Sequence, residues 1–149
     1  MPLIGIRSYP RDVRKARDMN AEKTSIAAEL AQVTKHWTPR VVGSVNDQYV
    51  KVAKLLGELV WHAHENEDEM FLVVSGRLRI QLEGEQEVVL GPGQFHVVPR
   101  GVMHNPIAEE EVHIVLIETV TTAHTGDVVI DRTVAVEDQV AAFTGNPEG

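Results

Sequence analysis

Three histidines and one glutamate stand out because their types and spacing suit metal chemistry. His62 and His64 are two residues apart, Glu69 follows a short acidic loop, and His104 lies farther along. Side chains two residues apart on a strand point to the same face, so both imidazoles of the pair can face one side. Imidazoles together with a carboxylate suit first-row divalent metals. These spacings predict a metal site mounted on β-strands.

The residues around this group predict the strands that would carry it. Glu58–His64 is expected to be one strand and Glu69–Val74 the next, with the polar residues 65–68 as the turn between them. An antiparallel hairpin would return Glu69 to the side of the histidine pair. Phe71 and Val73 share the face of Glu69 and are expected to form a dry pocket wall. His104 lies much farther along the chain, so a barrel or sandwich is needed to bring it near the other three residues.

Two longer motifs contain these residues. The first reads Gly57, four residues, His62, Ala63, His64, four residues, Glu69, six residues, Gly76. The second reads Gly93, five residues, Pro99, Arg100, Gly101, two residues, His104, three residues, Ala108. The chain resembles the cupin superfamily, in particular small single-domain cupins. The family's first motif has five residues after its first glycine, and its second motif ends in asparagine, so this chain departs from the pattern at two points.

The resemblance implies a fold and a site. The fold would be all-β with a minor N-terminal helix: a cupin-type antiparallel β-barrel, also called a double-stranded β-helix or jelly roll. One divalent transition metal per chain would be bound by His62, His64, Glu69 and His104. Its identity among Fe, Mn, Ni, Zn, Co and Cu stays open. Neither departure from the motifs removes a ligand position.

Several neighbours of the expected ligands have alternative roles. Asp68 competes with Glu69, because the family's spacer is three or four residues, but Glu69 matches the residue type. His96 and His113 could line the pocket as acid, base or hydrogen-bonding partner, although a structural role is favoured. Trp61 should point away from His62 and pack. No catalytic residue is assigned.

Composition limits the class of protein. The 149 residues suit one domain, divided into an arm and helix at 1–37, a barrel at 38–118 and a tail at 119–149. The net charge of −8 argues against binding nucleic acid, which needs clustered lysine and arginine. There are no cysteines, and no stretch resembles a signal peptide or membrane span. A cytoplasmic protein is expected.

Periodicity predicts the remaining elements. A helix is expected from Asn20, its N-cap, to about His36, with an apolar stripe packed on the outside of the barrel. The tail is expected to hold an edge strand at Val128–Ile130 and a weak helix at Ala135–Phe143. The other expected strands are Arg40–Val45, Tyr49–Leu56, Leu78–Leu82, Val88–Leu90, Phe95–Val98 and Val112–Ile117.

Two classes of function remain. One is a metal-dependent enzyme acting on a small oxygen-rich molecule, as a dioxygenase or as an isomerase or lyase. The alternative is a non-catalytic cupin module that binds metal or a small ligand. In either case the expected partner is a small molecule, and neither nucleic acid nor a membrane is expected to bind. The chain is also expected to form a homodimer. The fold alone does not decide between the two.

Overall fold

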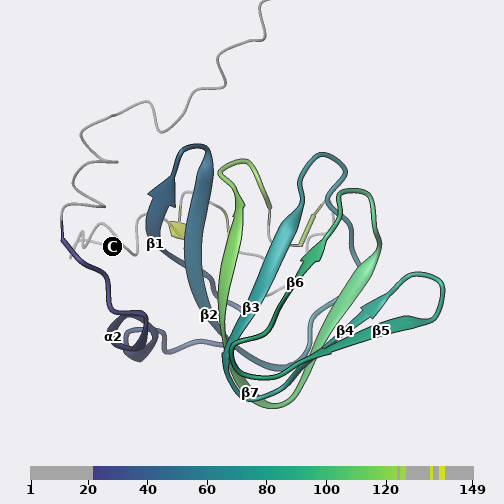
Figure 1. Cartoon of the computed structure of the whole chain (residues 1–149), viewed down its shortest axis with the longest axis horizontal. Helices are drawn as coiled ribbons and strands as arrows, with labels where there is room; N and C mark the ends of the chain where they lie inside the picture. Colours follow the sequence, from purple (N-terminus) through teal and green to yellow (C-terminus); the bar gives the residue numbers. More distant parts are fainter. Residues whose placement is uncertain (1–21, 124, 127–134, 136–137, 140–149) are drawn as a thin grey trace, which may run out of the picture.

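The computed structural model describes residues 22–123, 125–126, 135 and 138–139, and strands dominate it (Figure 1). The expected all-β fold with a minor helix is confirmed. Six predicted strands match those of the structure to within two residues at each end, whereas the last strand is much longer than the predicted Val112–Ile117. The elements are α2 (Ile26–Ala31), β1 (Arg40–Val45), β2 (Gln48–Glu58), β3 (Glu69–Ser75), β4 (Leu78–Leu82), β5 (Gln86–Leu90), β6 (Phe95–Val98) and β7 (His104–Thr119).

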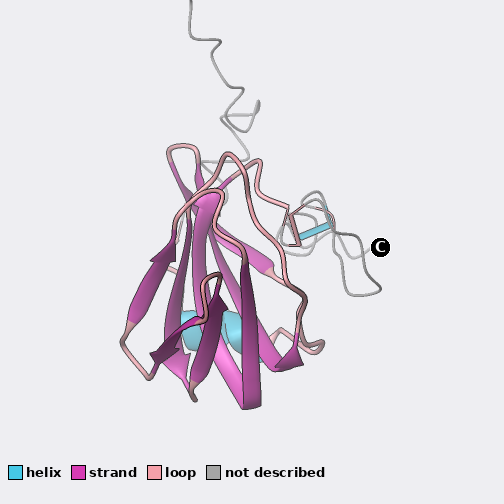
Figure 2. Cartoon of the chain, turned by 90° about the vertical axis from the view of Figure 1, so that its right-hand side faces the viewer, coloured by secondary structure: helices cyan, strands magenta, loops and turns pink. Residues whose placement is uncertain are grey.

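The long strand β7 joins the two halves of the barrel. It pairs with β2 along one side; along the other it pairs first with β4 and then with β3. The order β1-β2-β7-β3-β6 forms one sheet, and β5 extends the other half through β4. Every pairing is antiparallel, and the strands curve around a common interior (Figure 2). Because most neighbours in this sheet are distant in sequence, the fold can bring together motifs far apart in the chain.

The barrel interior is apolar over most of its length. Inward-facing residues alternate along each strand, as expected for a closed sheet. On β3 the inward positions are Glu69, Phe71 and Val73, and on β7 they include Ile114 and Leu116. Phe71 and Val73 are 4% and 1% exposed, so both are in the dry interior, and Phe71 lines the apolar cavity beside the predicted metal ligands, as expected. Polar groups in the interior therefore need partners there.

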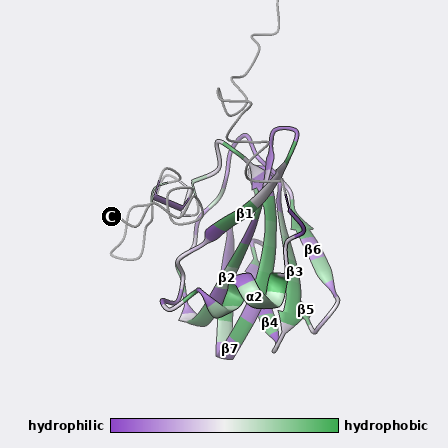
Figure 3. Cartoon of the chain, turned by 90° about the vertical axis from the view of Figure 1, so that its left-hand side faces the viewer, coloured by the Kyte–Doolittle hydropathy of each residue, from purple (hydrophilic) through white to green (hydrophobic). Residues whose placement is uncertain are grey.

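Helix α2 covers part of the outer face of the sheet. Leu30 and Val33 pack with Val42, Val52 and Val115 in a second apolar cluster, which confirms the predicted packing (Figure 3). The helix is shorter than predicted, since Ser25 is its N-cap and accepts a hydrogen bond from the backbone of Ala28. Asn20, the predicted cap, lies outside the described residues.

The segment before the first motif differs from the prediction. Glu58–His64 is not a strand: β2 runs to Glu58, and only His62 makes an isolated bridge beyond it. Gly57 has a positive φ of 82°, and the pairing of β2 with β7 shifts register between Leu55 and Gly57. Beyond this irregularity only Gly57 and Glu58 of β2 still pair with β7, and β2 ends there. The segment that carries the first two histidines is therefore irregular.

Some predictions fall on parts of the chain that the structure does not describe. The expected edge strand at 128–130 and His124 lie outside the described residues, as does most of the weak helix at 135–143. Within the described part of the chain, no helix has the length and hydrophobicity that crossing a membrane requires.

Candidate metal centre

Four side chains from separate parts of the chain converge at one end of the barrel interior. His62, His64, Glu69 and His104 each offer one ligand atom, and these atoms all lie within 4.8 Å of one another. The four residues are 0–5% exposed. The imidazole centroids of His62 and His104 are 4.3 Å apart, and those of His62 and His64 are 5.0 Å apart. This is a possible metal-binding site built from the predicted residues.

Backbone contacts hold the two motifs together. His62 and His104 exchange two backbone hydrogen bonds of 3.0 and 2.8 Å, and the backbone of Gly101 donates to the carbonyl of His64 at 2.7 Å. The predicted hairpin between the histidine pair and Glu69 is wrong, because Glu69 pairs with Val98 and Glu118 instead. The site is therefore assembled through the second motif and β7.

The ring hydrogen bonds leave one face of the site free for a cation. The Nδ1 of His62 donates to the carbonyl of Val60 at 2.8 Å, and the Nδ1 of His104 donates to the carbonyl of Val102 at 3.0 Å. A carbonyl can only accept, so these contacts fix the Nδ1–H tautomer of a neutral ring and leave its Nε2 as a potential ligand. The Nε2 atoms of all three histidines are buried and make no well-aligned hydrogen bond, and those of His64 and His104 lie 3.4 Å from the two carboxylate oxygens of Glu69. Since buried polar atoms normally find partners, this donor set fits a divalent metal.

Burial and charge set the protonation of the group. Burial, aided by the charge of His104, lowers the pKa of His62 to about 4. Burial also opposes protonation of His64, but the Glu69 carboxylate, 3.4 Å away, outweighs it and raises the pKa of His64. Burial would raise the pKa of Glu69, yet the neighbouring Glu118 and the imidazoles of His104 and His64, each 3.4 Å from its carboxylate, hold the pKa of Glu69 well below its usual range. An ionised Glu69 beside a neutral His62 is the state that a metal needs.

Sequence reasoning missed two further charged residues in the interior. Lys51 and Glu118 are 0% exposed, and the Nζ of Lys51 lies 2.7 Å from Oε1 of Glu118. Burial, with the charge of Glu69, raises the pKa of Glu118 well above its usual range. The alternation along Ile114, Leu116 and Glu118 is the signal that could have found the pair, since it places Glu118 on the inward face.

The other predicted candidates lie elsewhere. Asp68 accepts a hydrogen bond from the backbone of Arg100 at 2.9 Å, and Glu69, not Asp68, belongs to the convergent group. His113 hydrogen-bonds to Glu111 at 2.8 Å. His96 lies on β6 opposite Phe71 and is not part of the group. Trp61 is 41% exposed, so its predicted packing role is wrong.

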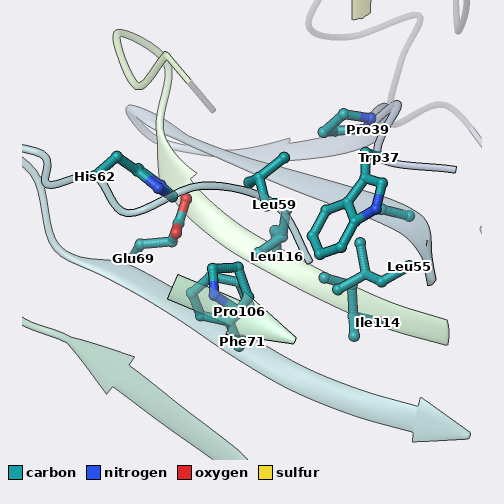
Figure 4. A pocket seen from close by; sticks show the side chains of 11 residues that line it. Trp37, Pro39, Leu55, Leu59, His62, Glu69, Phe71, Pro106, Ile114 and Leu116 are labelled. Carbon is teal, nitrogen blue, oxygen red and sulfur yellow. The ribbon is translucent and has the colours of Figure 1, made fainter. Parts of the chain in front are cut away.

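Two cavities border the group. The first is narrow, about 20 Å³, and has His62 and Glu69 at one end (Figure 4). Such a volume holds about one water molecule. Its remaining walls are apolar and include Trp37, whose indole N–H donates to the carbonyl of Leu56. The second cavity, about 140 Å³, borders His64 and is polar, with Asn66, Glu67 and Thr121 in its wall. Small molecules thus have two chemically different places beside the group.

Comparisons with known proteins agree with this fold. The family model described as "Cupin domain" matches residues 50–120. A solved cupin-2 domain protein from Shewanella frigidimarina is 38% identical, with a TM-score of 0.64, covering 68% of this chain and 98% of that one. The chain therefore belongs to the cupin family, as its motifs predicted.

Two curated relatives are more distant or only partly matched. An uncharacterised protein, YdbB, of Bacillus subtilis is 35% identical over 63 residues, which are 42% of this chain. The chain spans 56% of the length of that relative. Acireductone dioxygenase of Bacillus licheniformis is 25% identical over 128 residues, covering 78% of this chain and 72% of that protein.

Proposed function

We propose that this cupin is a metal-dependent enzyme acting on a small oxygen-rich molecule, with His62, His64, Glu69 and His104 as the ligands of one divalent transition metal. The observation that carries the proposal is the set of three buried Nε2 atoms that make no well-aligned hydrogen bond and converge on one carboxylate. A purely structural role does not call for this set, since each unpaired buried polar atom costs about 1–3 kcal/mol.

The metal would supply Lewis acidity, and a redox-active metal would also supply electron transfer. The residues of this chain would bind the metal and orient the side chains that hold it. The carbonyls of Val60 and Val102 fix two imidazole rings, and the negative charge of Glu69 favours a bound cation. The apolar walls around Phe71 and Trp37 keep water away from one side of the centre. The polar cavity beside His64 suits the oxygen atoms of a substrate.

The reaction type divides into two possibilities. The relative named acireductone dioxygenase supports an oxygenase, which needs a redox-active metal. An isomerase or lyase needs only a Lewis acid, so Zn or Mn would serve as well as Fe.

One experiment separates them. Apo protein is loaded separately with Fe(II), Mn(II), Ni(II) or Zn(II) and offered small diols, keto acids, sugars and catechol-like compounds, with and without air. Oxygen uptake only with a redox-active metal supports the oxygenase, and turnover with several metals under nitrogen supports the isomerase or lyase. A ligand that binds, shifts the metal spectrum and emerges unchanged in every condition favours the alternative, a non-catalytic binding module.

A homodimer is part of the proposal. Val74, Phe95 and Val97 are 38%, 61% and 41% exposed on β3 and β6, beyond the area that α2 covers. Among the described residues, β6 pairs only with β3 and forms an edge of the sheet. Exposed apolar residues beside a free strand edge favour association with a second copy. A monomeric mass by light scattering at micromolar concentration would contradict it.

A further inference from the structure

The apolar cavity beside the candidate metal centre ends at a tryptophan. His62 and Glu69 lie at one end of this cavity, and Trp37 lies at the other (Figure 4). Its volume of about 20 Å³ leaves room for roughly one water-sized group. Trp37 is 4% exposed and belongs to the apolar cluster of the barrel interior. The indole ring therefore limits how far a group can extend into the cavity from the metal end.

Two hydrogen bonds fix the position of that ring. The backbone N–H of Trp37 donates to the carbonyl of Lys54 at 2.9 Å, and its indole N–H donates to the carbonyl of Leu56 at 2.7 Å. Leu56 lies between Leu55 and Gly57, where the pairing of β2 with β7 shifts register. Because the backbone and the side chain of Trp37 are both tied to β2, the ring cannot swing aside without breaking a hydrogen bond.

The backbone of Trp37 is strained. Its φ of 58° falls in the left-handed region, which is uncommon for a bulky residue. Residues persist there only where the surrounding structure over-determines them, and such residues cluster at active sites and ligand clamps. A need for apolar bulk explains the buried ring but not the strained backbone that carries it. The strain therefore points to a role for the placement of the ring.

We propose that Trp37 determines substrate size: it restricts the group that a metal-bound substrate extends into the cavity to about the size of a methyl group. The substrate is then a compact molecule that binds the metal through oxygen atoms and has no alkyl chain longer than methyl on the side facing Trp37. One methylene in a hydrophobic pocket is worth roughly 10–200-fold in discrimination, so a single well-placed ring is enough to select by length. The inference rests on the proposed function, because it needs a metal beside His62 and Glu69.

The test compares keto acids of increasing length on Co(II)-loaded protein. Pyruvate, α-ketobutyrate and α-ketocaproate carry the same oxygen atoms and differ only in alkyl length, and the Co(II) absorption spectrum reports their binding. Wild-type protein is expected to bind α-ketocaproate at least about 10-fold more weakly than pyruvate. Trp37→Gly is expected to bind α-ketocaproate at least about 10-fold tighter than wild type does, with pyruvate affinity changed by no more than about threefold. Glycine is chosen because it adopts a φ of 58° without strain.

The matched control is Leu30→Ala. Leu30 is also 4% exposed, but it packs in the cluster on the outer face of the sheet and does not line the cavity. Its truncation is expected to lower the Tm while the wild-type order of the three acids persists. Loss of length discrimination in Leu30→Ala as well would show that general loosening of the fold causes the effect, and the inference would fail.

Free indole gives a readout that needs no metal. Trp37→Gly protein is expected to bind indole in the vacated space, which raises its Tm, and on the Co(II)-loaded variant indole should restore the discrimination against α-ketocaproate. If Trp37→Gly does not fold, Trp37→Phe keeps a smaller ring and is expected to bind α-ketobutyrate at least about threefold tighter than wild type does.

Several results would overturn the inference. They are equal affinity of wild-type protein for the three acids, binding of Co(II) but of no acid, unchanged discrimination in the Trp37 variant that folds, and no binding of indole by Trp37→Gly. Wild-type protein that binds no Co(II) refutes the proposed metal site itself. That failure is distinguishable, because the binding of indole by Trp37→Gly does not depend on a metal.

Discussion

His62 and His104 form an antiparallel bridge in which each backbone N–H donates to the carbonyl of the other residue. The bridge joins the two sequence motifs at the positions of two expected ligands. It also sets their imidazole centroids 4.3 Å apart. Because both rings are further held through Nδ1, the two potential ligand atoms are positioned before any cation arrives, which reduces the ordering cost of binding.

Metal content is the first prediction. The double variant His62→Ala, His104→Ala is expected to lose its divalent metal, because ligand number sets affinity. Elemental analysis should find about one transition metal per wild-type chain and almost none in the variant. The matched control is His36→Ala, His113→Ala, which removes two histidines that bind Glu111 instead. Full metal content in the first variant would refute the assignment.

The second prediction distinguishes the two neighbouring acids. Glu69→Gln is expected to weaken metal binding by more than about 100-fold, since a direct ligand matters more than the supporting partners, whose loss costs roughly 10–100-fold. Asp68→Asn should leave the affinity nearly unchanged, because its amide oxygen can still accept the hydrogen bond from Arg100. Competition titration with Zn(II) compares the two. A larger loss in Asp68→Asn would reverse the assignment.

The histidine pair, Glu69 and His104 could be found from sequence because their types and spacing are informative without knowledge of the strand register. Lys51 and Glu118 had only a weaker signal, because alternation groups Glu118 with Ile114 and Leu116 but does not show that this face is buried. A single charged residue among alternating apolar ones resembles a solvent-facing position until the pairing of β2, β3 and β7 is known. The pairing of Glu69 was mispredicted for a related reason: short polar loops favour hairpins, but residues 65–68 follow an irregular segment, and β2 and β3 do not pair with each other.

The sequence pattern also did not predict that the backbone of the first motif is irregular. Val60 and Trp61 favour a strand by type, yet after the register shift near Gly57 the pairing of β2 with β7 lasts only to Glu58. The helix was predicted in the right place but too long, since the stripe of Ile26, Leu30 and Val33 continues past Gln32, where the helix ends. Local patterns thus located the elements, while tertiary contacts set their ends.

The third prediction concerns pH and stability. The Glu111 carboxylate binds the Nε2 atoms of His36 and His113, both at 2.8 Å, and these contacts lower the pKa of Glu111 to about 2. A lowered pKa stabilises the fold above the unfolded value of about 4.5, and this contribution is lost as the pH falls towards 2. Glu111→Gln should therefore lower the Tm at pH 6, and the difference should shrink below about pH 4.5.

The control for this prediction is Glu110→Gln, which removes an equal charge from the adjacent position. Because Glu111 is exposed, the effect is expected to be small and to weaken with added salt. Thermal unfolding of the three proteins from pH 3 to pH 6 makes the comparison. A constant difference between Glu111→Gln and wild type over that range would contradict the role of the two histidines.

The last prediction concerns the glycine that closes the first motif. Gly76 has a φ of 86°, and a Cβ there would lie 2.8 Å from the backbone oxygen of Glu111. Gly84 has a similar φ of 77°, but a Cβ there would meet nothing within 4 Å. The left-handed conformation costs a non-glycine residue roughly 1–2 kcal/mol, so both alanine variants should be destabilised by about that amount. Gly76→Ala should lose at least about 1 kcal/mol more, because backbone must shift to relieve the contact. Urea unfolding of the two variants measures the difference, and equal losses would show that the close approach to β7 carries no cost.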